Sequence, residues 1–200
     1  MQLPGRENRI KEPPFKLFSS LVQTLAEVLV PYLDVPYAFF GHSMGGLICF
    51  ELARLFRNQG VFTPKYLFVS ASCAPQMRNA QPLIHQLPDK EFIEAIINFS
   101  NVSEHVLRNP MVVETFLPLL RADLAVTETY IYFQEAPLDC PITALGGFQD
   151  RIVNRSDLNG WREQTVDTFT FRMFSGDHFF INSNRDVLLA AIHKDLMSNK

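Results

Sequence analysis

The sequence predicts an α/β protein with a mostly parallel sheet and a helical insertion. Two observations predict this class. Residues 37–71 contain, in order, an apolar run, a glycine turn, an amphipathic helix and a second apolar run. This order is typical of two parallel strands joined by a crossover helix. Strand patterns are then absent over 72–135 and return afterwards. With 200 residues, 47% of them hydrophobic, the chain can bury a sizeable core.

The first half of the chain supplies the elements of the crossover. Apolar residues recur at spacings of three and four from Phe18, which predicts a helix that ends near Pro36. The short aromatic run 37–40 predicts a buried strand. A helix over 44–58 and a second buried strand over 65–71 follow.

The second half contains the insertion and the returning strands. The insertion is expected to contain three helices, which start near Asp89, Ser103 and Pro110. After it we expect strands over 141–146 and 168–174 and a closing helix over 186–197. The chain is therefore predicted to be one domain over 1–200, with a helical insertion at about 74–135 within it.

Composition excludes several kinds of partner. Eighteen basic and 21 acidic residues give a net charge of −3, and no basic run is present, so nucleic acid is not an expected partner. The polar start and the lack of a long apolar window predict a cytoplasmic protein that does not bind membranes. Cys49, Cys73 and Cys140 are far apart, as in proteins with reduced thiols. The histidines are isolated from one another, so no metal site is predicted.

A candidate nucleophile lies in the sequence Gly-His-Ser-Met-Gly at 41–45. This G-x-S-x-G pattern falls where a predicted strand turns into a helix, which is the setting of a nucleophile elbow. Two glycines allow a sharp turn and close packing of the helix, so that Ser43 stands at a strained corner. The N–H of Met44 at the helix N-terminus is the predicted oxyanion donor. An ordinary glycine-rich turn is the alternative.

The base that activates this serine is expected in the loop after the last strand. In this arrangement the order along the chain is serine, carboxylate, histidine, and His178 directly follows the strand 168–174. His42 is adjacent to the nucleophile, and adjacent side chains point apart, which argues against it as the base. Structural or solvated roles are expected for the other histidines, His85, His105 and His193.

Two carboxylates compete as the partner of the base. Asp150 follows the strand 141–146 and can approach the imidazole from a neighbouring loop. Asp177 is adjacent to His178 in sequence and would reach the far nitrogen less easily. A turn or cap role would also explain Asp150 and Asp157, because Asp side chains often bond nearby backbone N–H groups.

Six segments, spread over nearly the whole chain, carry a family resemblance: Leu3-Pro4-Gly5-Arg6, Phe39-Phe40-Gly41-His42-Ser43-Met44-Gly45, Phe68-Val69-Ser70, Leu120-Arg121-Ala122-Asp123, Leu138-Asp139-Cys140-Pro141-Ile142 and Asp177-His178-Phe179-Phe180. They resemble the corresponding segments of type II thioesterases, the free-standing α/β hydrolases that proofread nonribosomal peptide and polyketide synthases. Related enzymes release medium-chain acids from fatty acid synthase.

The resemblance implies an α/β-hydrolase fold and a function. It implies hydrolysis of acyl thioesters on the phosphopantetheine arm of a carrier domain, without a cofactor, to clear misprimed or stalled chains. The family's triad falls on Ser43, Asp150 and His178, and its lid falls on the insertion.

One feature of the family is missing from the sequence. Family members carry several strands and a Phe-Pro-x-Ala-Gly-Gly-like loop upstream of the Leu-Pro-Gly-Arg segment, and that loop donates a second oxyanion N–H. We therefore expect an N-terminally truncated hydrolase that lacks this donor, a loss worth roughly 10² to 10³ in rate. The alternatives are a carboxylesterase, a medium-chain acyl thioesterase, and an inactive chain that still binds a carrier domain.

Overall fold

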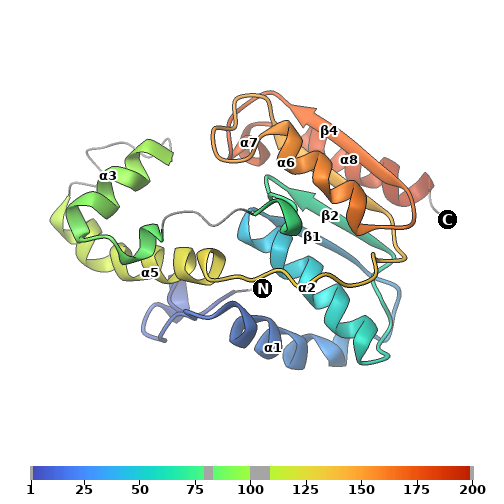
Figure 1. The fold of residues 1–200 in the computed structure, drawn as a ribbon, viewed down its shortest axis with the longest axis horizontal. Helices are drawn as coiled ribbons and strands as arrows, with labels where there is room; N and C mark the ends of the chain where they lie inside the picture. Colours follow the sequence, from blue (N-terminus) through green and yellow to red (C-terminus); the bar gives the residue numbers. More distant parts are fainter. Residues whose placement is uncertain (1, 79–82, 100–108, 199–200) are drawn as a thin grey trace. The chain divides into compact units, whose positions relative to one another are not determined.

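The computed structural model describes residues 2–78, 83–99 and 109–198, which form two compact units (Figure 1). One unit comprises Met1–Thr24 and Ala80–Ile131, and the other comprises Leu25–Asn79 and Tyr132–Lys200. The second unit contains the whole described sheet and the candidate site.

The sheet has four parallel strands in the order β1-β2-β3-β4. These strands are β1 (Ala38–His42), β2 (Tyr66–Ser70), β3 (Ile142–Gly147) and β4 (Phe169–Phe174). The described helices of this unit are α2 (Met44–Asn58), α6 (Arg155–Asn159), α7 (Phe180–Ser183) and α8 (Arg185–Ser198). The predicted α/β class with a parallel sheet is confirmed. Because the strands are parallel, their carboxyl ends share one edge, and the loops after β1, β3 and β4 meet there.

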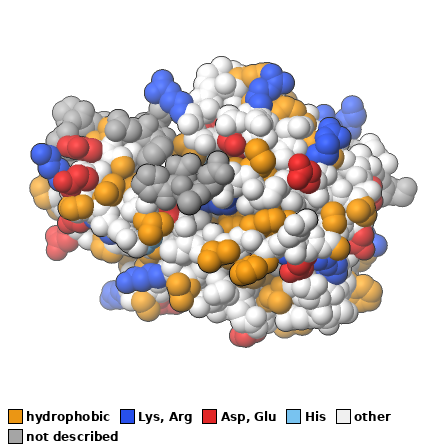
Figure 2. Space-filling view, in the orientation of Figure 1, with side chains coloured by type: hydrophobic (Ala, Val, Ile, Leu, Met, Phe, Trp, Pro, Cys, Tyr) orange, Lys and Arg blue, Asp and Glu red, His pale blue; other side chains and the backbone are white. Residues whose placement is uncertain are grey.

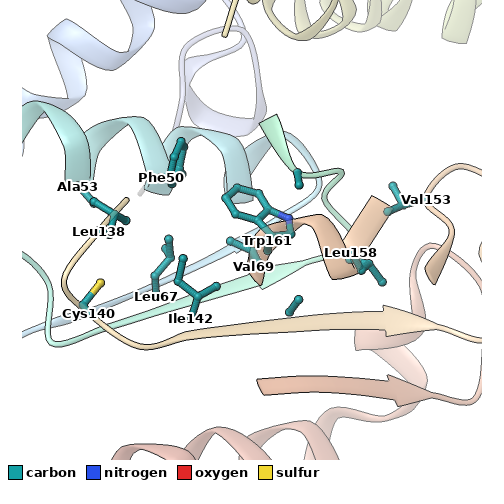
Figure 3. Packing of buried hydrophobic residues seen from close by; sticks show 12 residues of the cluster. Phe50, Ala53, Leu67, Val69, Leu138, Cys140, Ile142, Val153, Leu158 and Trp161 are labelled. Carbon is teal, nitrogen blue, oxygen red and sulfur yellow. The ribbon is translucent and has the colours of Figure 1, made fainter. Parts of the chain in front are cut away.

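Both faces of the sheet are covered, as expected for parallel strands. Every residue of β2 is buried, and its side chains alternate between two clusters. Leu67 and Val69 pack with Phe50 of α2 and with Trp161, and these side chains fill the space between α2 and the sheet (Figure 3). The opposite face packs against α7 and α8, with the cluster Tyr66, Phe68, Ala71, Leu145, Phe174, Phe180 and Leu188.

A buried polar network joins α8 to three strands. The hydroxyls of Tyr66 and Thr143 are 2.9 Å apart, and Thr143 donates to Asp195 of α8 at 3.1 Å. Arg172 of β4 forms an ion pair with the same carboxylate. Since a buried charge is costly without partners, this network explains how an aspartate is accommodated under the sheet.

The other unit contains α3 (Asp89–Phe99), α5 (Pro110–Glu128) and the start of α1 (Phe18–Leu29). Arg6 binds both carboxylate oxygens of Asp123 in α5, at 2.6 and 2.7 Å. Two of the segments that carry the family resemblance, Leu3-Pro4-Gly5-Arg6 and Leu120-Arg121-Ala122-Asp123, therefore meet in this unit.

The surface carries charges of both signs, which are interspersed on the face that Figure 2 shows.

Most predicted elements agree with the structure to within one or two residues, and α2 agrees at both ends. The helix expected to reach Pro36 instead ends at Leu29 and continues as a 3-10 turn over Val30–Tyr32. Pro31 explains this, because proline lacks an N–H and disfavours α geometry in the residue before it. The helix expected to start near Asp89 begins at Asp89 itself. The helix expected from Ser103 lies outside the described residues, and α6 was not predicted.

No helix among the described residues is both long and apolar enough to cross a lipid bilayer.

Candidate active site

Ser43 occupies a strained turn between β1 and α2. Its φ of +55° lies in the left-handed region, where a residue with a side chain is uncommon. The N–H of Ser43 donates to the carbonyl of Ser70 on the neighbouring strand at 2.7 Å, which fixes the turn against the sheet. The predicted strand, turn and helix are thus all present.

The close approach in this turn involves Gly41 and Gly46. A Cβ on Gly41 would lie 2.1 Å from the carbonyl oxygen of Gly45, and a Cβ on Gly46 would lie 2.7 Å from the Cβ of Ser72. A Cβ on Gly45 would have no neighbour within 4 Å. Of the two motif glycines expected to allow close packing, Gly41 is tightly enclosed and Gly45 is not, and Gly46 is the residue that faces Ser72.

The three residues predicted to act together lie within hydrogen-bonding distance. Nε2 of His178 is 3.0 Å from Oγ of Ser43, and Nδ1 is 2.9 Å from Oδ2 of Asp150. His178 is 7% exposed, and the side chain of Asp150 is 1% exposed. A histidine between a hydroxyl and a buried carboxylate is the arrangement that transfers a proton from the hydroxyl.

Hydrogen bonds from His178 and from two backbone N–H groups lower the pKa of the Asp150 carboxyl. Its Oδ1 accepts the N–H groups of Ile152 and Val153 at 2.8 and 3.0 Å. Burial alone would raise the pKa of this carboxyl, but the hydrogen bonds from His178 and these two N–H groups bring it below its ordinary value. The turn role considered for Asp150 is present, and it coexists with the contact to His178.

The loops after β3 and β4 are bonded to each other. Phe148 donates to the carbonyl of Phe174 at 2.8 Å, and Gln149 donates to that of Gly176 at 2.9 Å. A Cβ on Gly147 would lie 2.3 Å from the carbonyl oxygen of Asp177, so only glycine fits there. Sequence reasoning missed Gly147, although its place just before the predicted carboxylate was a usable signal.

Asp177, the competing carboxylate, and Asp157, for which a turn or cap role was considered, both accept hydrogen bonds from nearby backbone N–H groups. Asp177 accepts the N–H of Phe179 at 2.8 Å, and Asp157 forms a capping box with Asn154 at the start of α6. Among the other histidines, His85 bonds to Glu128 at 2.6 Å, His193 is exposed on α8, and His105 lies outside the described residues.

Met44 is the first residue of α2, and a backbone N–H at this position has no acceptor within the helix. The N–H of Met44 is therefore available to a ligand.

The part of the chain that the structure describes contains no group of three His, Cys, Asp or Glu side chains placed to hold a metal ion. Burial raises the pKa of the thiols of Cys49 and Cys140 to about 12 and that of Cys73 to about 11, so these thiols stay protonated at neutral pH.

A parallel sheet with a serine in a strained strand–helix turn, and with a carboxylate and a histidine after later strands, defines an α/β hydrolase. Comparison with known proteins then gives the family. The family model described as a thioesterase domain matches residues 1–196, and the chain belongs to this family.

The relatives include proteins of peptide and polyketide pathways. Linear gramicidin dehydrogenase LgrE of Brevibacillus parabrevis is 41% identical over 201 residues, covering 99% of this chain and 76% of its own. Gramicidin S biosynthesis protein GrsT of Aneurinibacillus migulanus is 42% identical, covering 98% and 77%. The solved structure of the type II thioesterase BorB from the borrelidin biosynthetic cluster has a TM-score of 0.85 at 36% identity, covering 96% and 78%. The resemblance to type II thioesterases is confirmed.

Proposed function

We propose that this chain hydrolyses acyl thioesters carried on the phosphopantetheine arms of carrier proteins in nonribosomal peptide or polyketide synthesis, where it removes misprimed or stalled groups. The observation that carries the proposal is the line of contacts from Ser43 through His178 to Asp150 in a chain of the thioesterase family. The relatives named for gramicidin and borrelidin pathways support the synthase context.

In the first half of the reaction, Nε2 of His178 takes the proton of the Ser43 hydroxyl as Oγ attacks the thioester carbonyl. The carbonyl oxygen becomes negative and accepts the N–H of Met44. Asp150 holds the tautomer with a proton on Nδ1 and stabilises the imidazolium. When the C–S bond breaks, the imidazolium returns its proton to the sulfur, and the carrier leaves with a free thiol.

In the second half, water attacks the acyl group on Ser43. Nε2 of His178 removes a proton from this water, and the imidazolium then gives it to Oγ as the ester bond breaks. The products are a free acid and the restored serine. Each proton moves through one imidazole nitrogen, so no cofactor enters the scheme.

In this proposal the insertion at about 74–135, which contains α3 and α5, has the role of the family's lid. The carrier protein is the partner, and the cytoplasm is the compartment, where the three free cysteines would remain reduced.

The name of one relative refers to a dehydrogenase, and the first strand–helix turn argues against carrying that activity over. A nicotinamide-binding turn usually has the spacing G-x-G-x-x-G, which brings backbone N–H groups against a pyrophosphate. Here residues 41–46 read Gly-His-Ser-Met-Gly-Gly, with a serine in the third position. This turn suits nucleophilic attack.

A substrate panel tests the proposal. The same acyl group is presented on a phosphopantetheinylated carrier domain, on coenzyme A and as a p-nitrophenyl ester, and kcat/KM is measured for each. We expect the carrier-bound thioester to be at least tenfold better than either small substrate. Equal values would favour a general esterase, and binding of the carrier with no turnover of any substrate would favour the inactive alternative.

A further inference from the structure

The proposed reaction does not use His42, yet the ring of this elbow residue lies against the loop of the base. Its centroid is 5.2 Å from that of His178, 6.1 Å from that of Phe179 and 6.3 Å from that of Phe180, all distances of interacting rings. These three consecutive residues form the segment that carries the base. The ring of His42 therefore supports this segment from the end of β1.

The neighbouring strand holds His42 in place. The register of the sheet sets it opposite Ser70, and its Nδ1 lies 3.0 Å from the Ser70 hydroxyl. Ser70 is fully buried, and its carbonyl is also the acceptor of the Ser43 N–H at 2.7 Å. One residue thus fixes both the backbone of the nucleophile and the ring that lies against the base.

The imidazole of His42 is uncharged at neutral pH. Burial and the neighbouring His178 lower its pKa to about 4, against the opposite effect of Asp150. Its Nε2 is buried and has no hydrogen-bond partner among the residues that the structure describes. A neutral ring leaves His178 free to accept a proton, whereas a cation at this position would oppose that step.

We propose that His42 is a positioning residue: hydrogen-bonded to Ser70, it holds the loop of His178 so that Nε2 meets the Ser43 hydroxyl. This inference rests on the proposed function, because it assigns His42 to the same reaction. A support of this kind affects rate strongly, since catalytic groups must be held within about 0.5 Å of productive geometry.

Two substitutions of His42 separate the ring from its hydrogen bond. His42→Asn keeps a polar group near the position of Nδ1 and removes the part of the ring that lies against the loop. His42→Phe keeps a ring and removes the bond to Ser70. We expect each variant to lower kcat about tenfold with KM changed less than twofold, because the proposed role of His42 is to position the base and not to contact the substrate. His193→Asn, the same change at an exposed site on α8, is the matched control and should match wild type.

A second measurement reports on the nucleophile directly. The rate constant for labelling of Ser43 by a fluorophosphonate should decrease in both variants by about the same factor as kcat. Rates are calculated per site that can be labelled, so that misfolded protein does not contribute. The acid limb of the kcat/KM profile should keep its midpoint in His42→Asn, because an uncharged ring adds no charge there. A midpoint shifted by a full pH unit would overturn the positioning role and indicate a charged His42.

A double-mutant cycle tests the link to Ser70. Ser70→Ala removes the hydroxyl and keeps the carbonyl that holds Ser43. If the bond is what positions the ring, the variant with both His42→Phe and Ser70→Ala should lose about tenfold, like each single variant. A loss of about a hundredfold would show that the two substitutions act independently and would contradict the proposal. Unchanged kcat in both His42 variants, or a change confined to KM, would also contradict it.

Failure of the proposed function can be distinguished from failure of this inference. If wild type itself is neither labelled at Ser43 nor active, the proposed function fails. Equal labelling of wild type and both His42 variants rejects the role of His42 alone.

Discussion

Replacing Asp150 by asparagine should nearly abolish turnover without unfolding the protein. An amide oxygen in place of Oδ1 can still accept the N–H groups of Ile152 and Val153, so the turn that holds the residue is retained. The NH₂ group then faces Nδ1 of His178 and favours the tautomer with the proton on Nε2. That proton points at Ser43, so the base can no longer accept from the hydroxyl.

The size of this effect follows from the tautomer change. The same amide replacement in a serine-protease triad lowers kcat about 10⁴-fold, or about 5.5 kcal/mol of transition-state stabilisation. We expect a loss of this order in hydrolysis of a carrier-bound thioester measured by release of free thiol, with a melting temperature close to wild type. Asp177→Asn is the matched control, since an amide oxygen can still accept the N–H of Phe179, and it should lose less than tenfold. A larger loss in Asp177→Asn than in Asp150→Asn would reassign the carboxylate.

Three further predictions concern stability and packing. The pKa of His42 is lowered to about 4 in the folded state, so the unfolded chain binds more protons between about pH 6.5 and 4, and stability should fall with acid over this window. The shift is worth at most about 3 kcal/mol of unfolding free energy, and partial exposure should halve this value. The unfolding free energy of His42→Asn, measured by chemical denaturation at several pH values, should therefore fall less steeply with acid than that of wild type. Equal pH dependence of the two proteins would refute the burial of this ring. Gly41→Ala should abolish soluble, active protein, whereas Gly45→Ala should keep its fold and melting temperature, because only the Cβ at position 41 meets backbone atoms. Similar soluble yields and similar melting temperatures for the two variants would contradict this geometry. Trp161→Phe should cost about 1–3 kcal/mol of unfolding free energy, because the Ser72 carbonyl loses the indole N–H that reaches it at 2.7 Å; a change below about 0.5 kcal/mol in urea unfolding would mean that this bond adds little.

Local sequence signals were sufficient for the elements around the nucleophile. The helix Met44–Asn58 is bounded by a glycine turn and by the end of its apolar pattern, and these signals do not depend on the rest of the chain. The rule that triad residues follow parallel strands in a fixed order then placed Asp150 and His178 in the loops where the structure has them.

What the sequence did not reveal depends on contacts between distant segments. The requirement for glycine at Gly46 and Gly147 comes from Ser72 and from the backbone of Asp177, neither of which is visible in a local pattern. The position of the His42 ring against His178 also depends on the pairing of strands. The alternation of side chains along a strand predicts only that the side chains of His42 and Ser43 point in different directions. Helix α6 is only five residues long, too short for a clear helical period.

The central claim is that Ser43 carries the acyl group during turnover. The most direct test is to mix the protein with an acyl-loaded carrier domain, quench within the first turnover and identify the acylated residue by peptide mass spectrometry. We predict one acyl group on the peptide that contains Ser43, decaying as free acid forms, and neither the acyl-enzyme nor the acid with Ser43→Ala. Acylation of another residue, or hydrolysis that persists in Ser43→Ala, would contradict the account.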